Sequence, residues 1–270
     1  MIFRYPGGKS KLLEPIKEHL YPLIEKSNGF TEPFTGGGSV LVQVAKDFPE
    51  ARLFANDKDI TIYSFWLLFK YDFDEYFEEL YKLIRQKPTV DLFIKMREDG
   101  IPKDEVGRAY YAIFFNRTTF SGIQTSGPIG GYSQSSKYKI DCRYNAERII
   151  KECEALRVLF KDRLDVRNDD CVDFVQHLPE MGAYLDPPYY VKGKELYPTF
   201  MQDKEHDNLA ETLRGRKMWV LSYDICPEID ELYSWANRIP LDARYSITDR
   251  KKTWVDKKEY IILPQRESNG

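Results

Sequence analysis

The sequence has 270 residues, of which 42% are hydrophobic and 31% are charged, and its formal net charge is −3. A chain of this length can bury a full core as one large α/β domain, or as a domain that carries a sub-domain. No apolar run approaches the roughly 20 residues that cross a bilayer, and the first residues lack the long apolar segment of a secretory signal. We therefore expect a cytoplasmic protein with no membrane partner.

The first sixty residues alternate between helical and extended patterns. Residues 10–26 carry leucine and isoleucine at helical spacing, and Ser10 is the expected N-cap. Residues 29–40 read as a short strand that runs into a glycine turn, and residues 41–48 as the helix after it. A second strand over residues 51–59 ends at Asn56 and Asp57. This order is typical of the first half of a doubly wound nucleotide-binding sheet.

The pattern changes between residues 61 and 158. Residues 60–86 and 105–118 are helical and aromatic, while residues 120–139 form a loop rich in glycine, serine, threonine and tyrosine. Loops of this length inside a compact chain are usually functional or disordered. We expect a mostly helical insert over 61–158 and a catalytic domain made of residues 1–60 and 159–270.

Strand patterns resume after the insert. They cover residues 162–170, 182–190, 217–224, 236–248 and 258–264, with a helix over residues 207–215. Together with the first sixty residues they predict an α/β fold with a Rossmann-like sheet.

The glycine turn and the carboxylate after the second strand point to a nucleotide ligand. Gly36, Gly37 and Gly38 permit positive φ and close approach of the backbone to a ligand, and the next helix offers unpaired amides. Asp57 follows Gly36 by 21 residues, where a carboxylate can accept hydrogen bonds from ribose hydroxyls. A plain structural turn is the alternative. Because nothing at this glycine turn resembles the Walker lysine-serine pair that binds a triphosphate, an adenosine-containing ligand is favoured.

The stretch "AYLDPPYY", residues 183–190, places Asp186 at the carboxyl end of a strand. The two prolines remove backbone donors and leave carbonyl acceptors at the mouth of the sheet. Tyr189 adds a flat aromatic face. Asp186 and the Pro187 carbonyl can together accept both hydrogens of an exocyclic amine on a ring. A rigid turn packed by tyrosines is the alternative.

Five segments together resemble a known family. "RYPGGKS", "EPFTGGGSV", "ANDKD", "FFNRTTFSG" and "YLDPPYY" occur in the order seen in the Dam-like DNA adenine-N6 methyltransferases, and the resemblance covers nearly the whole chain. It implies a methyltransferase that uses S-adenosylmethionine and no metal. The acceptor would be the N6 amine of an adenine flipped out of double-stranded DNA, because an adenine inside a duplex cannot reach such a site.

The resemblance also implies roles for single residues. Tyr5, where the family commonly has tryptophan, and Lys9 would meet the methionine end of the cofactor. Asp170, or its neighbour Asp169, would accept from the cofactor adenine. The full set of expected cofactor contacts is Tyr5, Lys9, Phe34, Gly36, Gly38, Asp57, Asp170 and Asp186. The expected catalytic residues are Asp186, Pro187 and Tyr189, and Tyr189 would stack on the flipped base.

DNA contacts are expected from the insert and from a later basic loop. Residues 107–167 hold 11 basic against 6 acidic side chains, and residues 242–258 hold 6 against 3. Phe120 is either a wedge in DNA or a core residue of the insert, and the basic residues are either phosphate contacts or a solvated surface. The expected DNA contacts are Arg117, Thr118, Thr119, Phe120, Ser121, Lys137, Lys139, Arg143, Arg250, Lys251 and Lys252.

Alternatives remain at the level of function. The same chemistry would act on an RNA adenine, on cytosine N4 or on a glutamine amide, although glutamine methylation usually goes with Asn in place of Asp186. A catalytically silent DNA-binding homologue is the alternative from another class. We expect a monomer or weak dimer, cytoplasmic or associated with the nucleoid. The target sequence stays open, as does the biological setting: restriction-modification, a phage enzyme or a solitary methylase.

Overall fold

The computed structural model describes residues 2–3, 9, 12–190, 201–246 and 254–265, without the side chains of residues 242–258. Tyr5, Arg250, Lys251 and Lys252 lie outside the described residues, so their expected contacts stay predictions.

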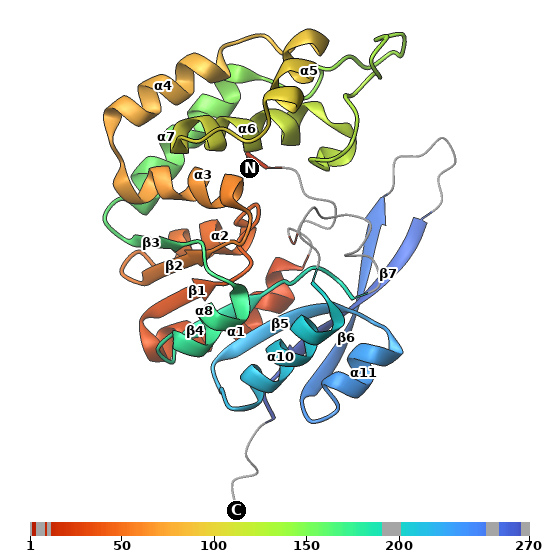
Figure 1. Ribbon diagram of the computed structural model, residues 1–270. Helices are drawn as coiled ribbons and strands as arrows, with labels where there is room; N and C mark the ends of the chain where they lie inside the picture. Colours follow the sequence, from red (N-terminus) through yellow and green to blue (C-terminus); the bar gives the residue numbers. More distant parts are fainter. Residues whose placement is uncertain (1, 4–8, 10–11, 191–200, 247–253, 266–270) are drawn as a thin grey trace, which may run out of the picture.

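A seven-stranded sheet in the order β3-β2-β1-β4-β5-β7-β6 forms the centre of the molecule (Figure 1). Its strands are β1 (Gly29–Glu32), β2 (Arg52–Asn56), β3 (Leu164–Arg167), β4 (Gly182–Leu185), β5 (Trp219–Asp224), β6 (Asn237–Ser246) and β7 (Trp254–Leu263). Strands β1 to β5 pair in parallel, and β7 lies antiparallel between β5 and β6. The strand order reverses between β1 and β4, where doubly wound sheets bind ligands at the carboxyl ends of the strands.

Both faces of the sheet are buried. Successive residues of a strand point to opposite faces, and accordingly Tyr184 of β4 packs in one hydrophobic cluster and Leu185 in the other. In β7, likewise, Ile261 packs in the first cluster and Ile262 in the second. The helices around the sheet are α1 (Leu13–Ser27), α2 (Ser39–Asp47), α8 (Cys171–His177), α10 (Asp203–Arg214) and α11 (Pro227–Leu232). The predicted α/β doubly wound fold is confirmed.

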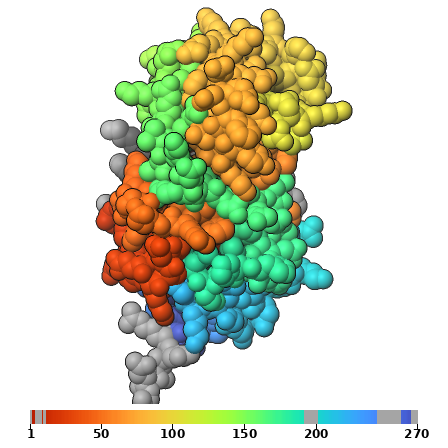
Figure 2. Space-filling model, turned by 90° about the vertical axis from the view of Figure 1, so that its left-hand side faces the viewer, coloured from red at the N-terminus to blue at the C-terminus, as the bar shows by residue number. Residues whose placement is uncertain are grey.

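A helical layer lies between β2 and β3 in the sequence and above the sheet in Figures 1 and 2. It contains α3 (Ile60–Tyr71), α4 (Asp74–Ile84), α5 (Val90–Asp99), α6 (Glu105–Thr118) and α7 (Ala146–Phe160). The mostly helical insert is therefore confirmed, while its division from the catalytic domain at residues 60 and 158 stays a prediction.

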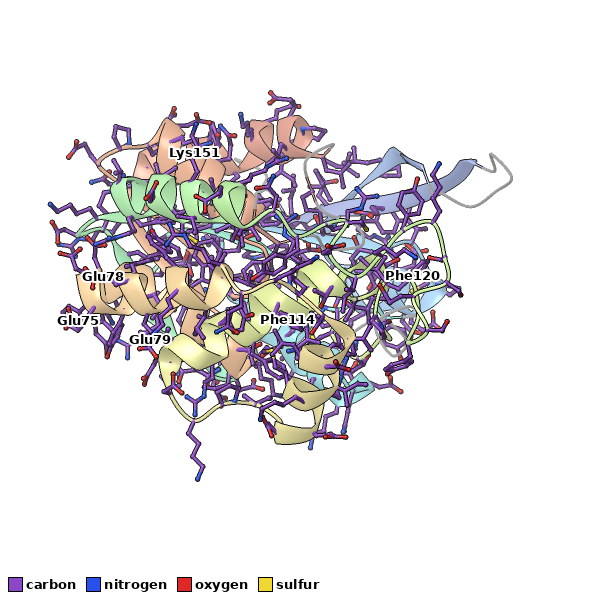
Figure 3. All side chains as sticks on the ribbon, turned by 90° about the horizontal axis from the view of Figure 1, so that it is seen from above. Glu75, Glu78, Glu79, Phe114, Phe120 and Lys151 are labelled. Atoms are coloured by element: carbon purple, nitrogen blue, oxygen red, sulfur yellow. The ribbon has the colours of Figure 1, made fainter. Side chains whose placement is uncertain are left out.

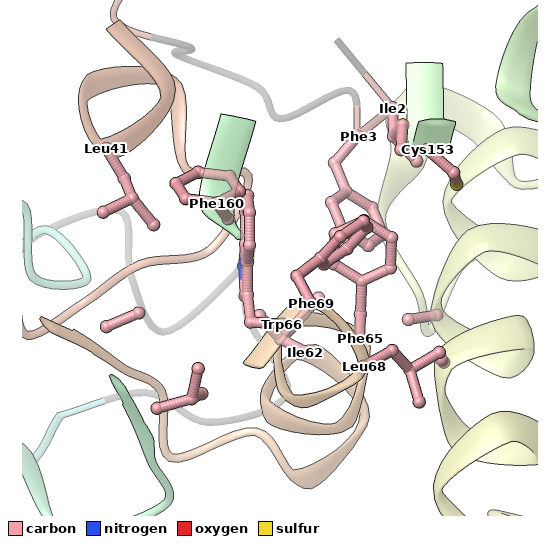
Figure 4. Packing of buried hydrophobic residues seen from close by; sticks show 14 of the residues in the cluster. Ile2, Phe3, Leu41, Ile62, Phe65, Trp66, Leu68, Phe69, Cys153 and Phe160 are labelled. Carbon is pink, nitrogen blue, oxygen red and sulfur yellow. The ribbon is translucent and has the colours of Figure 1, made fainter. Parts of the chain in front are cut away.

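Helix α3 joins this layer to the sheet. It packs against both α6 and β3. Its Trp66 ring meets the ring of Phe160 edge-on at 5.7 Å between centroids, and Phe65 meets Phe3 at 4.6 Å (Figure 4). Sheet, insert and N-terminal residues consequently share one continuous hydrophobic core.

The predicted N-cap at Ser10 is wrong. Helix α1 begins at Leu13, and its N-cap is Leu12, which makes no side-chain capping bond. A turn precedes the helix, because the Leu12 amide donates to the Lys9 carbonyl over 2.8 Å. Lys9 is thereby separated from the helix and free to turn towards the sheet. Within the described residues, no helix combines the length and the apolar character that crossing a membrane requires.

Candidate active site

Buried hydrogen bonds tie together the loops that follow β1, β2 and β3. Asn56, fully buried at the end of β2, donates its side-chain amide to the carbonyls of Pro33 at 3.1 Å and Asp169 at 3.2 Å. Its side-chain oxygen accepts from the Asp169 amide at 2.9 Å. Thr35 donates its hydroxyl to the carbonyls of Glu32 and Asn56. Three segments distant in sequence are thus held in fixed register at the mouth of the sheet.

The glycine loop adopts the positive φ that its residues predict. Gly36 has φ 45° and Gly38 has φ 61°. Packing also fixes the identity of Gly38, because an added Cβ would lie 2.3 Å from Cζ2 of Trp66. The Trp66 indole donates to the Gly36 carbonyl over 3.0 Å. The loop therefore rests on α3 of the helical layer, a support that the sequence pattern did not reveal.

Asp57 lies directly beside the glycine loop. One carboxylate oxygen accepts from the Gly36 amide at 2.7 Å and the other from the Asp59 amide at 2.9 Å. Burial raises the pKa of Asp57 to about 7, with the nearby charge of Asp59 adding to the rise. Gly36 and Asp57 thus lie together, and the carboxylate changes charge near neutral pH. The expected contact of Asp57 with a ribose stays a prediction.

Glu32 is a buried carboxylate that the sequence analysis did not single out. It ends β1, is 3% exposed, and accepts from the Leu41 amide in the first turn of α2 at 2.9 Å. A carboxylate is favourable there because the first amides of a helix are unpaired. Burial nevertheless raises the pKa of Glu32 well above its usual range, and the charges of Asp186 and Asp57 raise it further.

Asp170 caps a helix and forms an ion pair. It is the N-cap of α8, accepts from the Val172 amide at 3.0 Å and lies 3.1 Å from Nζ of Lys58. Lys58 also pairs with Glu205 of α10 at 3.0 Å. Burial raises the pKa of Asp170, but the bonds to Lys58 and Val172 outweigh it and hold the pKa below its usual value. Asp169 is exposed. Which of Asp169 and Asp170 accepts from the cofactor adenine stays a prediction.

Asp186 and Lys9 meet at the mouth of β4. Lys9 Nζ lies 3.0 Å from Oδ1 of Asp186, and it also donates to the hydroxyl of Tyr189. Burial raises the pKa of Asp186, while the charge of Lys9 opposes the rise. The structure thus brings together three residues that the sequence analysis had placed in two groups. The expected contact of Lys9 with the methionine end of the cofactor stays a prediction.

The remaining members of the expected site line the same region. Pro187 is buried, and Tyr189 is partly exposed with Lys9 Nζ 4.8 Å from its ring centroid. Phe34 and Tyr189 both pack against the second hydrophobic cluster. Glu259 of β7 also reaches Lys9, at 3.0 Å, and was missed because nothing local in "KEYIILP" marks a strand glutamate as buried.

The expected DNA-binding residues divide by exposure. Thr118 and Thr119 are fully buried, and their hydroxyls donate back to the carbonyls of Phe114 and Phe115 at 2.7 and 2.6 Å. Phe120 is 69% exposed, so the core alternative for this residue is wrong. Arg117 is partly buried at the end of α6, and Ser121 is exposed with a positive φ of 58°.

An exposed basic and aromatic loop follows Phe120. Lys137, Lys139 and Arg143 are exposed, as are Tyr132 at 62% and Tyr138 at 61%. In Figure 3 the labelled Phe120 lies on the side of the molecule where β6 and β7 project, opposite the glutamates 75, 78 and 79 of α4. Phe120 and these three glutamates therefore lie on opposite sides of the molecule.

A doubly wound sheet with a glycine loop, a buried carboxylate and an Asp-Pro-Pro-Tyr loop at its switch point defines the class of this α/β protein. Residues 5–247 match the family of D12 class N6 adenine-specific DNA methyltransferases. The chain belongs to this family and is an adenine-specific DNA methyltransferase.

Two of the proteins similar to this chain are a curated methyltransferase and a solved structure. The Type II methyltransferase M.MjaIII of Methanocaldococcus jannaschii is 27% identical over 202 residues, which are 69% of this chain and 68% of that protein. The solved structure of SMU.472 in complex with SAH shares 10% identity over 70% of this chain, with a TM-score of 0.28. The match spans 57% of that chain, and so distant a likeness supports no argument.

Proposed function

We propose that this chain transfers a methyl group from S-adenosylmethionine to the N6 amine of an adenine flipped out of double-stranded DNA, at a specific sequence. The observation that carries the proposal is the position of Asp186. It pairs with Lys9 at the carboxyl end of β4, and the glycine loop follows the neighbouring strand β1, across the point where the strand order reverses.

The donor set at Asp57 fits an adenosine. An ionised carboxylate offers roughly four acceptor positions, and two backbone amides use two of them. The other two suit the two hydroxyls of a ribose. Gly36 and Gly38, both with positive φ, support the proposal by bringing backbone rather than side chain to the ligand. When bound, S-adenosylmethionine supplies a methyl group already activated by its sulfonium.

The residues of the Asp186 loop would orient the acceptor. The Asp186 carboxylate and the Pro187 carbonyl accept the two amine hydrogens, which directs the nitrogen lone pair out of the ring plane. Tyr189 offers a ring on which the base stacks, a contact worth about 1–3 kcal/mol. That contact offsets part of the few kcal/mol that extrusion of a base costs. Aligning the reactants in this way can supply roughly 7–11 kcal/mol of the barrier reduction.

The surface around Phe120 would meet the DNA. Phe120 is exposed enough to enter a base step, and Lys137, Lys139 and Arg143 are exposed, so that they can face phosphates. Arg117 and Ser121 flank Phe120 and stay part of the proposed surface. Thr118 and Thr119 receive no DNA contact in this proposal, because their hydroxyls are buried and bonded within α6.

Methyl transfer is tested with labelled S-adenosylmethionine and unmethylated genomic DNA, followed by digestion and separation of the nucleosides. We expect label in N6-methyladenine and none in N4-methylcytosine. Asp186→Ala should abolish transfer and change cofactor affinity by less than about tenfold, because it removes the acceptor for the amine. Label in cytosine, or full turnover by this variant, would refute the assigned acceptor or the assigned role. Methylation-sensitive sequencing of host DNA then gives the target sequence.

A further inference from the structure

Glu259 completes a buried ionic cluster that joins distant parts of the chain. Lys9 Nζ lies 3.0 Å from Oδ1 of Asp186 and 3.0 Å from Oε2 of Glu259. Lys9 is 2% exposed and Glu259 is 1% exposed. Glu259 lies on β7 opposite Asp224 of β5, so the antiparallel strand brings a carboxylate to the mouth of the parallel sheet.

The cluster has one carboxylate more than an ordinary ion pair. The Lys9 ammonium contacts both carboxylates, so Lys9 alone does not neutralise Asp186 and Glu259 together. Retaining an excess charge away from water is costly unless an opposite charge arrives. In the proposed reaction a positive charge develops on the amine nitrogen beside Asp186, and fixed charges aimed at that position stabilise it. With Lys9 and Asp186 alone, the net charge facing the amine would be zero.

We propose that Glu259 is a positioning residue for methyl transfer. It holds Lys9 between two carboxylates, so that Lys9 orients Asp186 and Tyr189 without cancelling the negative charge that faces the amine. This inference rests on the proposed function, since the charge argument needs an amine acceptor at Asp186.

The groups around Lys9 determine its protonation. Burial lowers the pKa of Lys9, but the charges of Asp186 and Glu259 outweigh burial and raise the pKa above its ordinary value. Tyr189 stays neutral, because burial and the charges of the same two carboxylates keep its pKa well above the ordinary range. Glu32 of β1 is a further carboxylate near Asp186, whose charge raises the pKa of Glu32. Removal of the Glu259 charge should therefore lower the pKa of Lys9.

The experiment compares Glu259→Gln, Glu259→Asp and the control Glu18→Gln, which changes an exposed glutamate of α1. Three quantities are measured on the full chain: the single-turnover methylation rate against pH, the dissociation constant of S-adenosylmethionine, and the melting temperature. A fourth needs no reaction, namely the titration of Lys9 followed by NMR of lysines labelled at Cε. The signal is assigned by its loss in Lys9→Arg.

We expect Glu259→Gln to lower the single-turnover rate by about tenfold or more, with the cofactor dissociation constant changed less than about threefold. The Lys9 titration should move to lower pH, by on the order of one unit, and the alkaline loss of activity should move with it. Glu259→Asp should recover part of the rate because it restores the charge. Glu18→Gln should match the unsubstituted protein in every measurement.

Two outcomes would overturn the inference. One is an unchanged Lys9 titration or an unchanged rate in Glu259→Gln. The other is a parallel loss of rate, cofactor affinity and melting temperature that Glu259→Asp does not relieve, which would mean a structural role only. If the unsubstituted protein methylates no DNA, the proposed function fails and the catalytic part of the inference with it. The Lys9 titration then still decides whether Glu259 holds Lys9.

Discussion

At the scale of single residues, the site is a set of carboxylates whose environments differ. Glu32, Asp57 and Asp186 all have pKa values raised by burial, whereas Lys58 keeps that of Asp170 low. For Asp57, burial raises the pKa to about 7, which is near neutrality. Its charge therefore varies around neutral pH, and its proposed ligand hydroxyls need the ionised form as acceptor.

Cofactor affinity should consequently depend on pH. Below a pKa of about 7 Asp57 is protonated and accepts poorly, so the dissociation constant of S-adenosylmethionine should fall about tenfold between pH 6 and pH 8. Calorimetric titrations over this range measure it. Asp57→Asn should bind more weakly at pH 8. It should keep only the pH dependence contributed by the cofactor's own groups, so equal pH profiles for the two proteins would contradict the ribose contact.

At the scale of elements, the glycine loop depends on a helix of the insert. Gly38 packs against Trp66 of α3, and the Trp66 indole bonds Gly36. The proposed cofactor side of the site is thus built on the helical layer as well as on the sheet. A change in α3 is expected to reach the loop directly through this one indole.

Gly38→Ala should destabilise the protein more than its backbone geometry alone requires. A non-glycine residue at positive φ costs about 1–2 kcal/mol, and here the new Cβ would also collide with Trp66 at 2.3 Å. Gly131→Ala is the matched control, since its φ is 72° and an added Cβ there meets nothing within 4 Å. Thermal unfolding measures the difference. Equal melting temperatures for the two variants would show that Trp66 moves aside without cost.

The sequence predicted the elements and site residues that depend on neighbouring residues. Asp57 and Asp186 directly follow strands whose patterns are local, and both lie where the doubly wound order places them. Glu259 and Trp66 were not predicted, because their roles come from contacts across roughly 250 and 30 positions. Thr118 and Thr119 show the converse error, since a motif match carries no information on whether a hydroxyl turns back to its helix.

At the scale of the whole molecule, charge is divided between two sides. The acidic residues of α4 face away from Phe120 in Figure 3, and the loop after Phe120 carries exposed basic and aromatic side chains. A net charge of −3 therefore hides a surface that suits a polyanion. The average charge excluded nothing about DNA.

Salt dependence of DNA binding should locate that surface. Replacing Lys137, Lys139 and Arg143 by Gln should reduce the slope of log affinity against log salt by about 2–3, since each phosphate contact contributes about 0.9. The control changes three exposed lysines that are not part of the proposed surface, Lys82, Lys87 and Lys151, to Gln, so that both triple variants have the same net charge. Fluorescence anisotropy at several salt concentrations measures both slopes. Equal slopes for the two triple variants would place the DNA elsewhere.

The position of β7 between β5 and β6 has a consequence for the order of assembly. Strand β6 pairs only with β7 within the described sheet, yet a ribosome, adding about 5–20 residues per second, releases β6 first. Until β7 has been synthesised, β6 has no strand to pair with in the described sheet, and Lys9 cannot contact Glu259. The nascent protein can thus build the cofactor side while Lys9 still lacks its second carboxylate. Competence for transfer should appear late and in one step, after the parallel strands are already in place.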